Sequence, residues 1–104
     1  MSDQSMDIYT LGIWMLRSGR ENEFINEWSR FAKSTSKNTE GNGKAYLLQD
    51  EKNPSRFISF GPWQNMDAIK KWRDSEEFKN FVAIVKDLCI DFQPNTMREV
   101  ATSQ

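Results

Sequence analysis

The sequence contains no histidine and only a single cysteine. The missing imidazole removes the most common general base, the usual activator of serine and cysteine nucleophiles, and a frequent metal ligand. Cys89 has no disulfide partner within the chain and lies in an apolar helical pattern, so we expect a buried structural thiol in a reducing compartment. These shortages exclude most common catalytic arrangements and give no basis for predicting a metal site.

An excess of charge of one sign and long apolar runs are also missing. Fourteen basic and fifteen acidic side chains give a net charge of -1, with no block of like charge to hold a polyanion. No apolar run approaches the roughly 20 residues that span a bilayer, and the start MSDQSMD lacks the basic and apolar regions of a signal peptide. We therefore expect a soluble cytoplasmic protein that binds neither nucleic acid nor a membrane.

The length of the chain allows one hydrophobic core and therefore one domain. Its 104 residues and 12.2 kDa are too few for two cores, and a chain of this size gains stability by burying more surface against a partner. We expect the polar residues 1–7 to form a disordered N-terminal segment and residues 8–101 to form the domain.

Hydrophobic periodicity in the first half of the chain predicts three strands and a helix. Residues 8–17 predict a strand that is apolar on both faces and so needs cover on both sides. Ser18 and Glu21 have capping-box spacing before an amphipathic helix at 20–33, which the polar tract STSKNTEGNG is expected to end. The runs KAYLLQ and RFISFGPW predict an antiparallel hairpin.

The second half predicts two helical segments and a last strand. A short segment at 66–72 precedes one capped by Asp74 or Ser75, with an apolar stripe that we extend from Phe78 as far as Cys89 and Phe92. NTMREVAT predicts a weak final strand. The order βαββαβ indicates an α+β, ferredoxin-like fold with an antiparallel sheet and its helices on one face. The apolar second face indicates an interface with another copy or a ligand groove.

One stretch of the sequence is similar to a known family. The run FISFGPWQNMDAIKKWRDSEEF, with the opening strand and RSG before the first helix, resembles the antibiotic biosynthesis monooxygenase domain of the dimeric α+β barrel superfamily over about residues 8–101. The specific part is an aromatic strand ending in Trp63, a nine-residue step to Trp72, and the helix start SEEF. The resemblance implies a homodimer whose sheets face one another in a dimeric α/β barrel, with a pocket in each subunit between sheet and helices.

The resemblance also bears on activity and cofactors. Some members of the family oxidise phenolic or quinol-type polyketides with molecular oxygen and without metal or flavin, whereas others degrade haem. The haem-degrading branch has asparagine, tryptophan and histidine at positions that are here Gly12, Trp72 and Val82. Because the histidine that would ligate iron is missing, the sequence argues against haem degradation and we predict no cofactor and no metal.

Five residues are candidates for binding a substrate, and no catalytic residue can be named. Trp63 and Trp72 are able to stack on a flat ligand, but large aromatic residues are more often core residues, and both roles are compatible; Trp14 suits either a pocket or a dimer interface. Tyr46 is able to donate to a substrate oxygen or to lie exposed on its strand, and Arg98 points to either face.

Two hypotheses of function follow from the sequence. In the first, the protein binds a small apolar aromatic molecule of quinol or polyketide type and oxidises it with O2 without a cofactor. In the alternative, it is a non-catalytic small-molecule-binding or structural homodimer of the same fold, which the absence of an acid/base pair favours.

Overall fold

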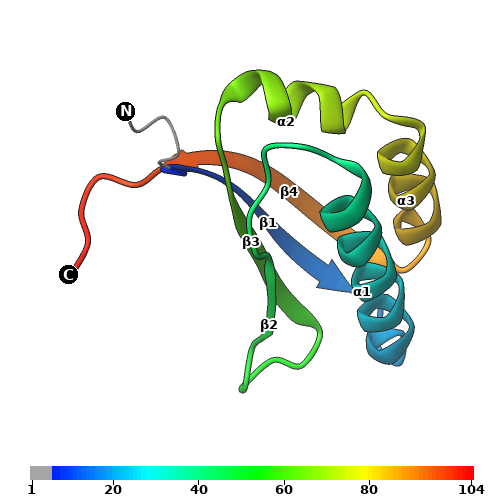
Figure 1. Cartoon of the computed structure of the whole chain (residues 1–104). Helices are drawn as coiled ribbons and strands as arrows, with labels where there is room; N and C mark the ends of the chain where they lie inside the picture. Colours follow the sequence, from blue (N-terminus) through cyan, green and yellow to red (C-terminus); the bar gives the residue numbers. More distant parts are fainter. Residues whose placement is uncertain (1–5) are drawn as a thin grey trace.

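A four-stranded antiparallel sheet forms the centre of the structure, a computed structural model that describes residues 6–104 (Figure 1). The strands, in the sheet order β2-β3-β1-β4, are β1 (Ile8–Leu16), β2 (Tyr46–Gln49), β3 (Arg56–Trp63) and β4 (Cys89–Arg98). The helices are α1 (Glu21–Asn38), α2 (Met66–Arg73) and α3 (Glu76–Lys86). The predicted α+β, ferredoxin-like arrangement is confirmed. Residues 1–5 of the predicted disordered segment 1–7 lie outside the described residues.

The three helices lie on one side of the sheet (Figure 1), and the side chains of the core pack between them and the strands. Strand β1 is central, pairing with β3 on one side and β4 on the other. Side chains alternate along it, so Trp14 and Leu16 point toward the helices. The other buried residues of this core are Phe24, Phe57, Phe81, Val85 and Leu88.

No described segment covers the opposite side of the sheet (Figure 1), and the strand pairing places apolar side chains on this side. The strand pairing assigns to it Tyr9, Leu11, Ile13, Met15, Tyr46, Leu48, Ile58, Phe60, Pro62 and Met97, which we call the open face. Among these, Leu48 is 52% exposed and Met97 46%. The apolar second face expected from the first strand is therefore present.

Helix α1 extends five residues beyond its predicted end at Lys33, into a tract rich in Ser and Thr. Residues of this kind form helices weakly because their hydroxyls compete for backbone hydrogen bonds. Here the hydroxyls have tertiary partners. The Ser34 hydroxyl donates to a Glu77 carboxylate oxygen at 2.6 Å, and Thr35 Oγ1 accepts from Trp72 Nε1 at 3.1 Å. These bonds to α2 and α3 compensate for the weak intrinsic preference, and the prediction of a loop at Ser34 was wrong.

The start of α1 also differs from the predicted capping box. The cap residue is Arg20, which makes no capping bond with its side chain, and Ser18 lies outside the helix. Instead, the Glu21 carboxylate accepts from the backbone N–H of Gly19 at 3.0 Å, next to a turn where Gly19 has a φ of 89°. The predicted cap of α3 is confirmed, since the Ser75 hydroxyl accepts from the Phe78 N–H at 3.1 Å.

Strand β4 begins at Cys89, six residues before the predicted start. Helix α3 ends at Lys86, so Cys89 and Phe92 are strand residues and the predicted helical stripe through them was wrong. Phe92 still points toward the helices, where its ring stacks on Trp14 at a centroid distance of 3.9 Å. The apolar spacing that suggests one long helix here comes from two elements that bury residues in the same core.

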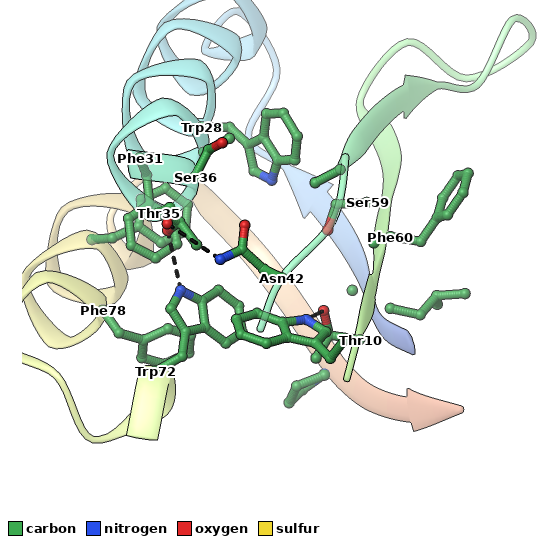
Figure 2. Close-up of a pocket in the computed structure, with 18 of the residues that line it drawn as sticks. Thr10, Trp28, Phe31, Thr35, Ser36, Asn42, Ser59, Phe60, Trp72 and Phe78 are labelled. Atoms are coloured by element: carbon green, nitrogen blue, oxygen red, sulfur yellow. Dashed lines mark hydrogen bonds between the residues drawn. The ribbon is translucent and has the colours of Figure 1, made fainter. Parts of the chain in front are cut away.

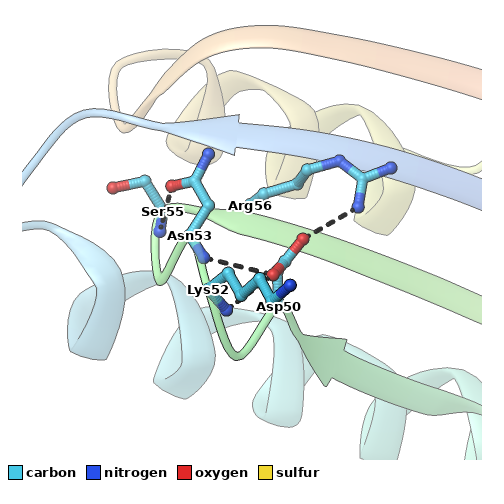
Figure 3. A network of polar contacts seen from close by, with 5 residues as sticks. All are labelled: Asp50, Lys52, Asn53, Ser55 and Arg56. Atoms are coloured by element: carbon cyan, nitrogen blue, oxygen red, sulfur yellow. Dashed lines mark hydrogen bonds and ion pairs between the residues drawn. The ribbon is translucent and has the colours of Figure 1, made fainter.

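Hydrogen bonds centred on Asp50 hold the turn between β2 and β3 (Figure 3). One carboxylate oxygen accepts from the backbone N–H groups of Lys52 and Asn53 at 2.8 and 3.1 Å, and the other accepts from Arg56 Nη1 at 3.2 Å. The two N–H bonds, followed by Arg56, hold the pKa of Asp50 below its ordinary value. The charged form of Asp50 therefore stabilises the turn.

We expect Asp50→Ala to lower the urea midpoint at pH 7, because it removes the acceptor for both N–H groups. Since the folded pKa lies below the unfolded one, this stabilisation is present above the ordinary Asp range and is lost as the pH falls through the folded pKa. The difference from the native chain should therefore shrink as the pH is lowered below the ordinary pKa range of Asp. The control is Glu51→Ala at the neighbouring exposed position. Equal midpoints for the native chain and Asp50→Ala at pH 7 would contradict this account.

Candidate functional site

A cavity of about 370 Å³ lies between the helix side of the sheet and the helices (Figure 2). Strands β1, β3 and β4, all three helices, and the segment 42–45 before β2 contribute to its wall. Helix α1 supplies Trp28, Phe31 and Thr35 on one side, and the sheet supplies Thr10 and Ser59 on the other. Its volume falls in the range of small-molecule sites in proteins, about 300–1,000 Å³.

Aromatic rings form most of the apolar wall, and several of them also belong to the core. Trp14 and Trp63 are only 4% and 3% exposed, yet both line the cavity. Trp72 packs against Trp63 at a centroid distance of 4.9 Å and stacks on Phe31 at 5.8 Å. The sequence left open whether these tryptophans belong to the core or to a pocket, and in the structure the same side chains belong to both.

Three indole N–H groups in this wall donate to hydroxyl oxygens. The pairs are Trp14 with Ser59 at 3.0 Å, Trp63 with Thr10 at 3.1 Å, and Trp72 with Thr35 at 3.1 Å. Each bond satisfies a polar group that would be costly to bury alone. A hydroxyl that accepts from an indole keeps its own hydrogen for a further bond, and all three hydroxyl residues line the cavity. The wall thus has O–H donors at three fixed places.

Asn42 and Trp28 add polar atoms to the cavity at other points (Figure 2). The Asn42 amide nitrogen donates to the carbonyl oxygens of Thr39 at 2.6 Å and Thr35 at 3.4 Å, which ties it to the end of α1 and leaves its amide oxygen as an acceptor. Within the part of the chain that the structure describes, the Trp28 indole donates to no protein atom. Both groups are therefore available to a ligand.

Gly12 leaves room for the side chains of Trp14, Ser59 and Phe92 at this site. A Cβ atom at Gly12 would lie 2.9 Å from Trp14 Nε1 and 3.1 Å from Ser59 Oγ, in the space that their hydrogen bond occupies. A third neighbour, an edge atom of the Phe92 ring, would lie at 3.1 Å. The missing side chain lets the Trp14 indole reach Ser59.

We expect Gly12→Ala to destabilise the fold by about 1–3 kcal/mol, the usual cost of inserting a methyl group into a packed core. The added methyl would push the Trp14 ring away from Ser59, so the tryptophan emission should shift as well. Urea unfolding followed by both fluorescence and circular dichroism measures the two effects. An unchanged midpoint with unchanged emission would contradict the proposed role of Gly12.

The ionisable residues at the cavity are all cationic. Among residues 6–104, Lys33, Lys44 and Arg73 line it, and no Asp or Glu does. Cys89 lies outside the lining, and burial raises the pKa of its thiol to about 11, which keeps it protonated and unreactive at neutral pH. Residues 6–104 contain no group of three side chains of the His, Cys, Asp and Glu types placed to hold a metal ion. The described site therefore has hydroxyl donors, indole rings and cations, without an acid/base pair.

The structure brings together three of the five predicted site residues. Trp14, Trp63 and Trp72 line the cavity, whereas Tyr46 and Arg98 do not. Tyr46 pairs with Phe60 on the open face and is 44% exposed, because strand alternation directs its ring away from the helices. Arg98 lies exposed at the end of β4, opposite Ile8. The prediction that Tyr46 bounds the pocket was therefore wrong.

Several lining residues had no distinctive signal in the sequence. Ser59, Thr35 and Asn42 are common polar residues, and only their positions opposite indole rings or at a helix end make them part of the site. Trp28 lies within the predicted amphipathic helix at 20–33, and it lines the cavity from α1. The three positions that we compared with the haem-degrading branch, Gly12 among them, all line this cavity.

Comparison with models of protein families shows to which family the chain belongs. Residues 9–84, which are 76 of the 104, match the model of the antibiotic biosynthesis monooxygenase family. The chain belongs to this family. No helix within the described residues is long and apolar enough to cross a membrane.

Solved structures share the fold at low sequence identity. SnoaB, a cofactor-independent oxygenase from Streptomyces nogalater, has a TM-score of 0.85 and 14% identity over 95% of this chain and 98% of its own. A conserved protein from Methanosarcina mazei Go1 has a TM-score of 0.83 and 16% identity over 93% of this chain and 96% of its own. A comparison with curated protein sequences gives no match.

Proposed function

We propose that this protein binds a small, flat aromatic molecule in the cavity and oxidises it with O2 without a bound cofactor. The observation that carries the proposal is a cavity of about 370 Å³ with indole rings in its wall and hydroxyl donors held in place by those same indoles. Aromatic rings provide flat contact area, and a few fixed polar groups orient the ligand. Membership of a monooxygenase family supports the same conclusion.

Oxidation without a cofactor requires a substrate that supplies its own electrons. A hydroxylated ring system whose ring CH2 loses a proton becomes an electron-rich anion that reacts with O2. The CH2 carbon becomes C=O, one atom of O2 enters the product, and the other leaves as water, so four electrons pass from substrate to oxygen. The protein then has to bind the substrate, exclude water and stabilise the anion.

The hydroxyl groups of the wall suit this task. In our proposal Ser59 Oγ–H donates to the oxygen on which negative charge develops, while Trp14 Nε1 holds Ser59 in position at 3.0 Å. Thr35 has an equivalent relation to Trp72 at 3.1 Å. Hydrogen-bonded chains polarise one another, so an indole bond strengthens the donor beyond it. The rings of Trp63 and Trp72 provide stacking surface for the substrate.

A non-catalytic binding protein of the same fold is the second candidate. One observation favours it: the lining supplied by the described part of the chain contains no Asp or Glu, and the sequence contains no histidine, so this lining has no strong base to take a proton from a substrate. The two candidates share the binding step and differ only in O2 consumption. An acidic substrate, ionised before it binds, removes the need for a protein base.

Oxygen uptake with a panel of an anthrone, a naphthoquinol and a phenol tests the catalytic proposal. We expect the native chain to raise uptake above the protein-free rate with at least one compound. Ser59→Ala should lower the rate about tenfold or more, because removal of one donor to a developing oxyanion has effects of at least this size. Trp72→Phe should weaken binding, since it removes ring area and the bond to Thr35.

Two controls separate catalysis from binding. Ser18→Ala makes the same chemical change at an exposed position outside the cavity and should retain the native rate. Saturable quenching of tryptophan fluorescence by the same compounds measures binding alone. Uptake at the protein-free rate across the panel, with saturable quenching, would reject catalysis and leave the binding protein.

We also propose that the protein is a homodimer that buries the open face of one copy against the other. Exposed apolar area of this extent on a small domain usually marks an interface. Leu48 and Met97 are 52% and 46% exposed there, whereas the helix side of the sheet is packed by the protein's own core. Two copies related by a two-fold axis would each present the same self-complementary surface.

Light scattering on two matched variants tests the dimer. We expect the native chain to have about twice its single-chain mass of 12.2 kDa. Leu48→Lys should give a folded monomer, because it places an unpaired charge in the interface at a position already 52% exposed in one copy. Ile84→Lys makes the same change at a 46% exposed position on α3 and should remain dimeric. A native chain of single-copy mass would reject the proposal.

A further inference from the structure

The charge of the cavity wall differs from that of the chain as a whole. Acidic side chains outnumber basic ones by fifteen to fourteen in the sequence, yet the cavity lining that residues 6–104 form has three cationic residues and no acidic one. A wall with one sign of charge and a low-dielectric, aromatic surround attracts ligands of the opposite sign. The cavity therefore favours an anion over a neutral or cationic molecule of the same shape.

Of the three cations, Arg73 is the one placed to meet a ligand. The Lys44 ammonium lies 5.4 Å above the ring centre of Tyr46, whose side chain belongs to the open face, so it is directed away from the cavity. Lys33 is exposed on α1. Arg73 is half-buried at the end of α2 and immediately follows Trp72, which supplies ring surface to the same cavity.

Arg73 is held in place but carries no counter-charge. Its Nη2 donates to Thr96 Oγ1 on β4 at 3.3 Å, a neutral partner. Among residues 6–104 it forms no ion pair, although the neighbouring Asp74 does so with Lys70 at 3.8 Å. A guanidinium fixed by one hydroxyl keeps further N–H donors for a second partner, and their planar arrangement matches a carboxylate.

A second hollow continues from the cavity at this point. Phe92, Pro94 and Arg73 line both spaces, and Thr96 lines the second. Arg73 thus lies where the aromatic cavity opens toward the β4 edge of the sheet. A ligand with its rings against Trp72 and a polar substituent directed to this opening would bring that substituent to the guanidinium.

We propose that the natural ligand is an aromatic carboxylate, with its carboxylate bound by Arg73 and its rings in the cavity. This inference rests on the proposed function, since it assigns the charge of the ligand for the same site. It makes Arg73 a residue that determines specificity and gives it no part in the reaction with oxygen.

The test compares 2-naphthoate with 2-naphthamide, which have nearly the same shape and differ in charge at pH 7. Calorimetry should give a dissociation constant about fivefold lower for the naphthoate with the native chain at low salt, the gain expected from one partly exposed charge-assisted pair. Arg73→Gln should remove this preference by weakening the naphthoate and leaving the naphthamide unchanged. Arg73→Lys should retain part of the preference, because it keeps the charge without the planar fork.

Arg30→Gln is the matched control, since Arg30 is exposed on α1, lies outside both hollows and should not affect either ligand. Equal affinities of the two ligands for the native chain would overturn the inference while leaving the proposed aromatic site intact. A loss of affinity for both ligands in Arg73→Gln would also overturn it. If neither ligand nor any compound of the oxygenation panel bound saturably, this inference and the proposed function would fail together.

Discussion

A buried indole needs an acceptor for its N–H, and this requirement links the core of the protein to its cavity. Trp14 and Trp63 are almost fully buried against the sheet, and their nitrogens reach hydroxyl groups on the neighbouring strands. Those hydroxyls lie at the cavity wall. The bonds that allow tryptophan into a small core thus also fix the donors that a ligand would meet. A site built in this way needs no loop to position it, because strands hold both members of each of these two pairs.

Because the same residues form both the core and the cavity wall, few substitutions are tolerated at these positions. A residue that is both core and wall cannot change to suit a new ligand without a cost in stability, and Gly12 illustrates the limit, since even one methyl group there would enter the Trp14–Ser59 bond. Trp72 is less restricted, because it is only partly buried and its partner Thr35 lies on a helix rather than a strand. Variation among related sites should therefore be easier at α1 and α2 than at β1 and β3.

The sequence predicts the fold well where the spacing of apolar residues comes from a single strand or helix. It predicts the fold poorly where one continuous apolar spacing runs through two elements. The alternation of the first strand and the aromatic run ending in Trp63 were sufficient for the sheet and for the two tryptophans at the cavity. The apolar spacing from Phe78 to Phe92 follows a helix period, although the last of these residues lies on a strand. The helical tract after Lys33 depends on acceptors and donors that α2 and α3 supply. Likewise, no local signal places Tyr46 on the face away from the cavity, because that depends on pairing with β3.

The composition of the cavity wall depends on strand register, because the pairing of strands decides which side chains face the helices. On β3 the residues Phe57, Ser59 and Trp63 point to the helices, and Ile58 and Phe60 lie between them on the open face. A shift of pairing by one residue would exchange the two sets, placing phenylalanine where the hydroxyl stands. The Asp50 turn fixes how β2 meets β3, and the pairing with β1 fixes the other edge (Figure 3). None of the four residues of that network, Asp50, Lys52, Asn53 and Arg56, lines the cavity, so the turn contributes to the site only through the register that it maintains.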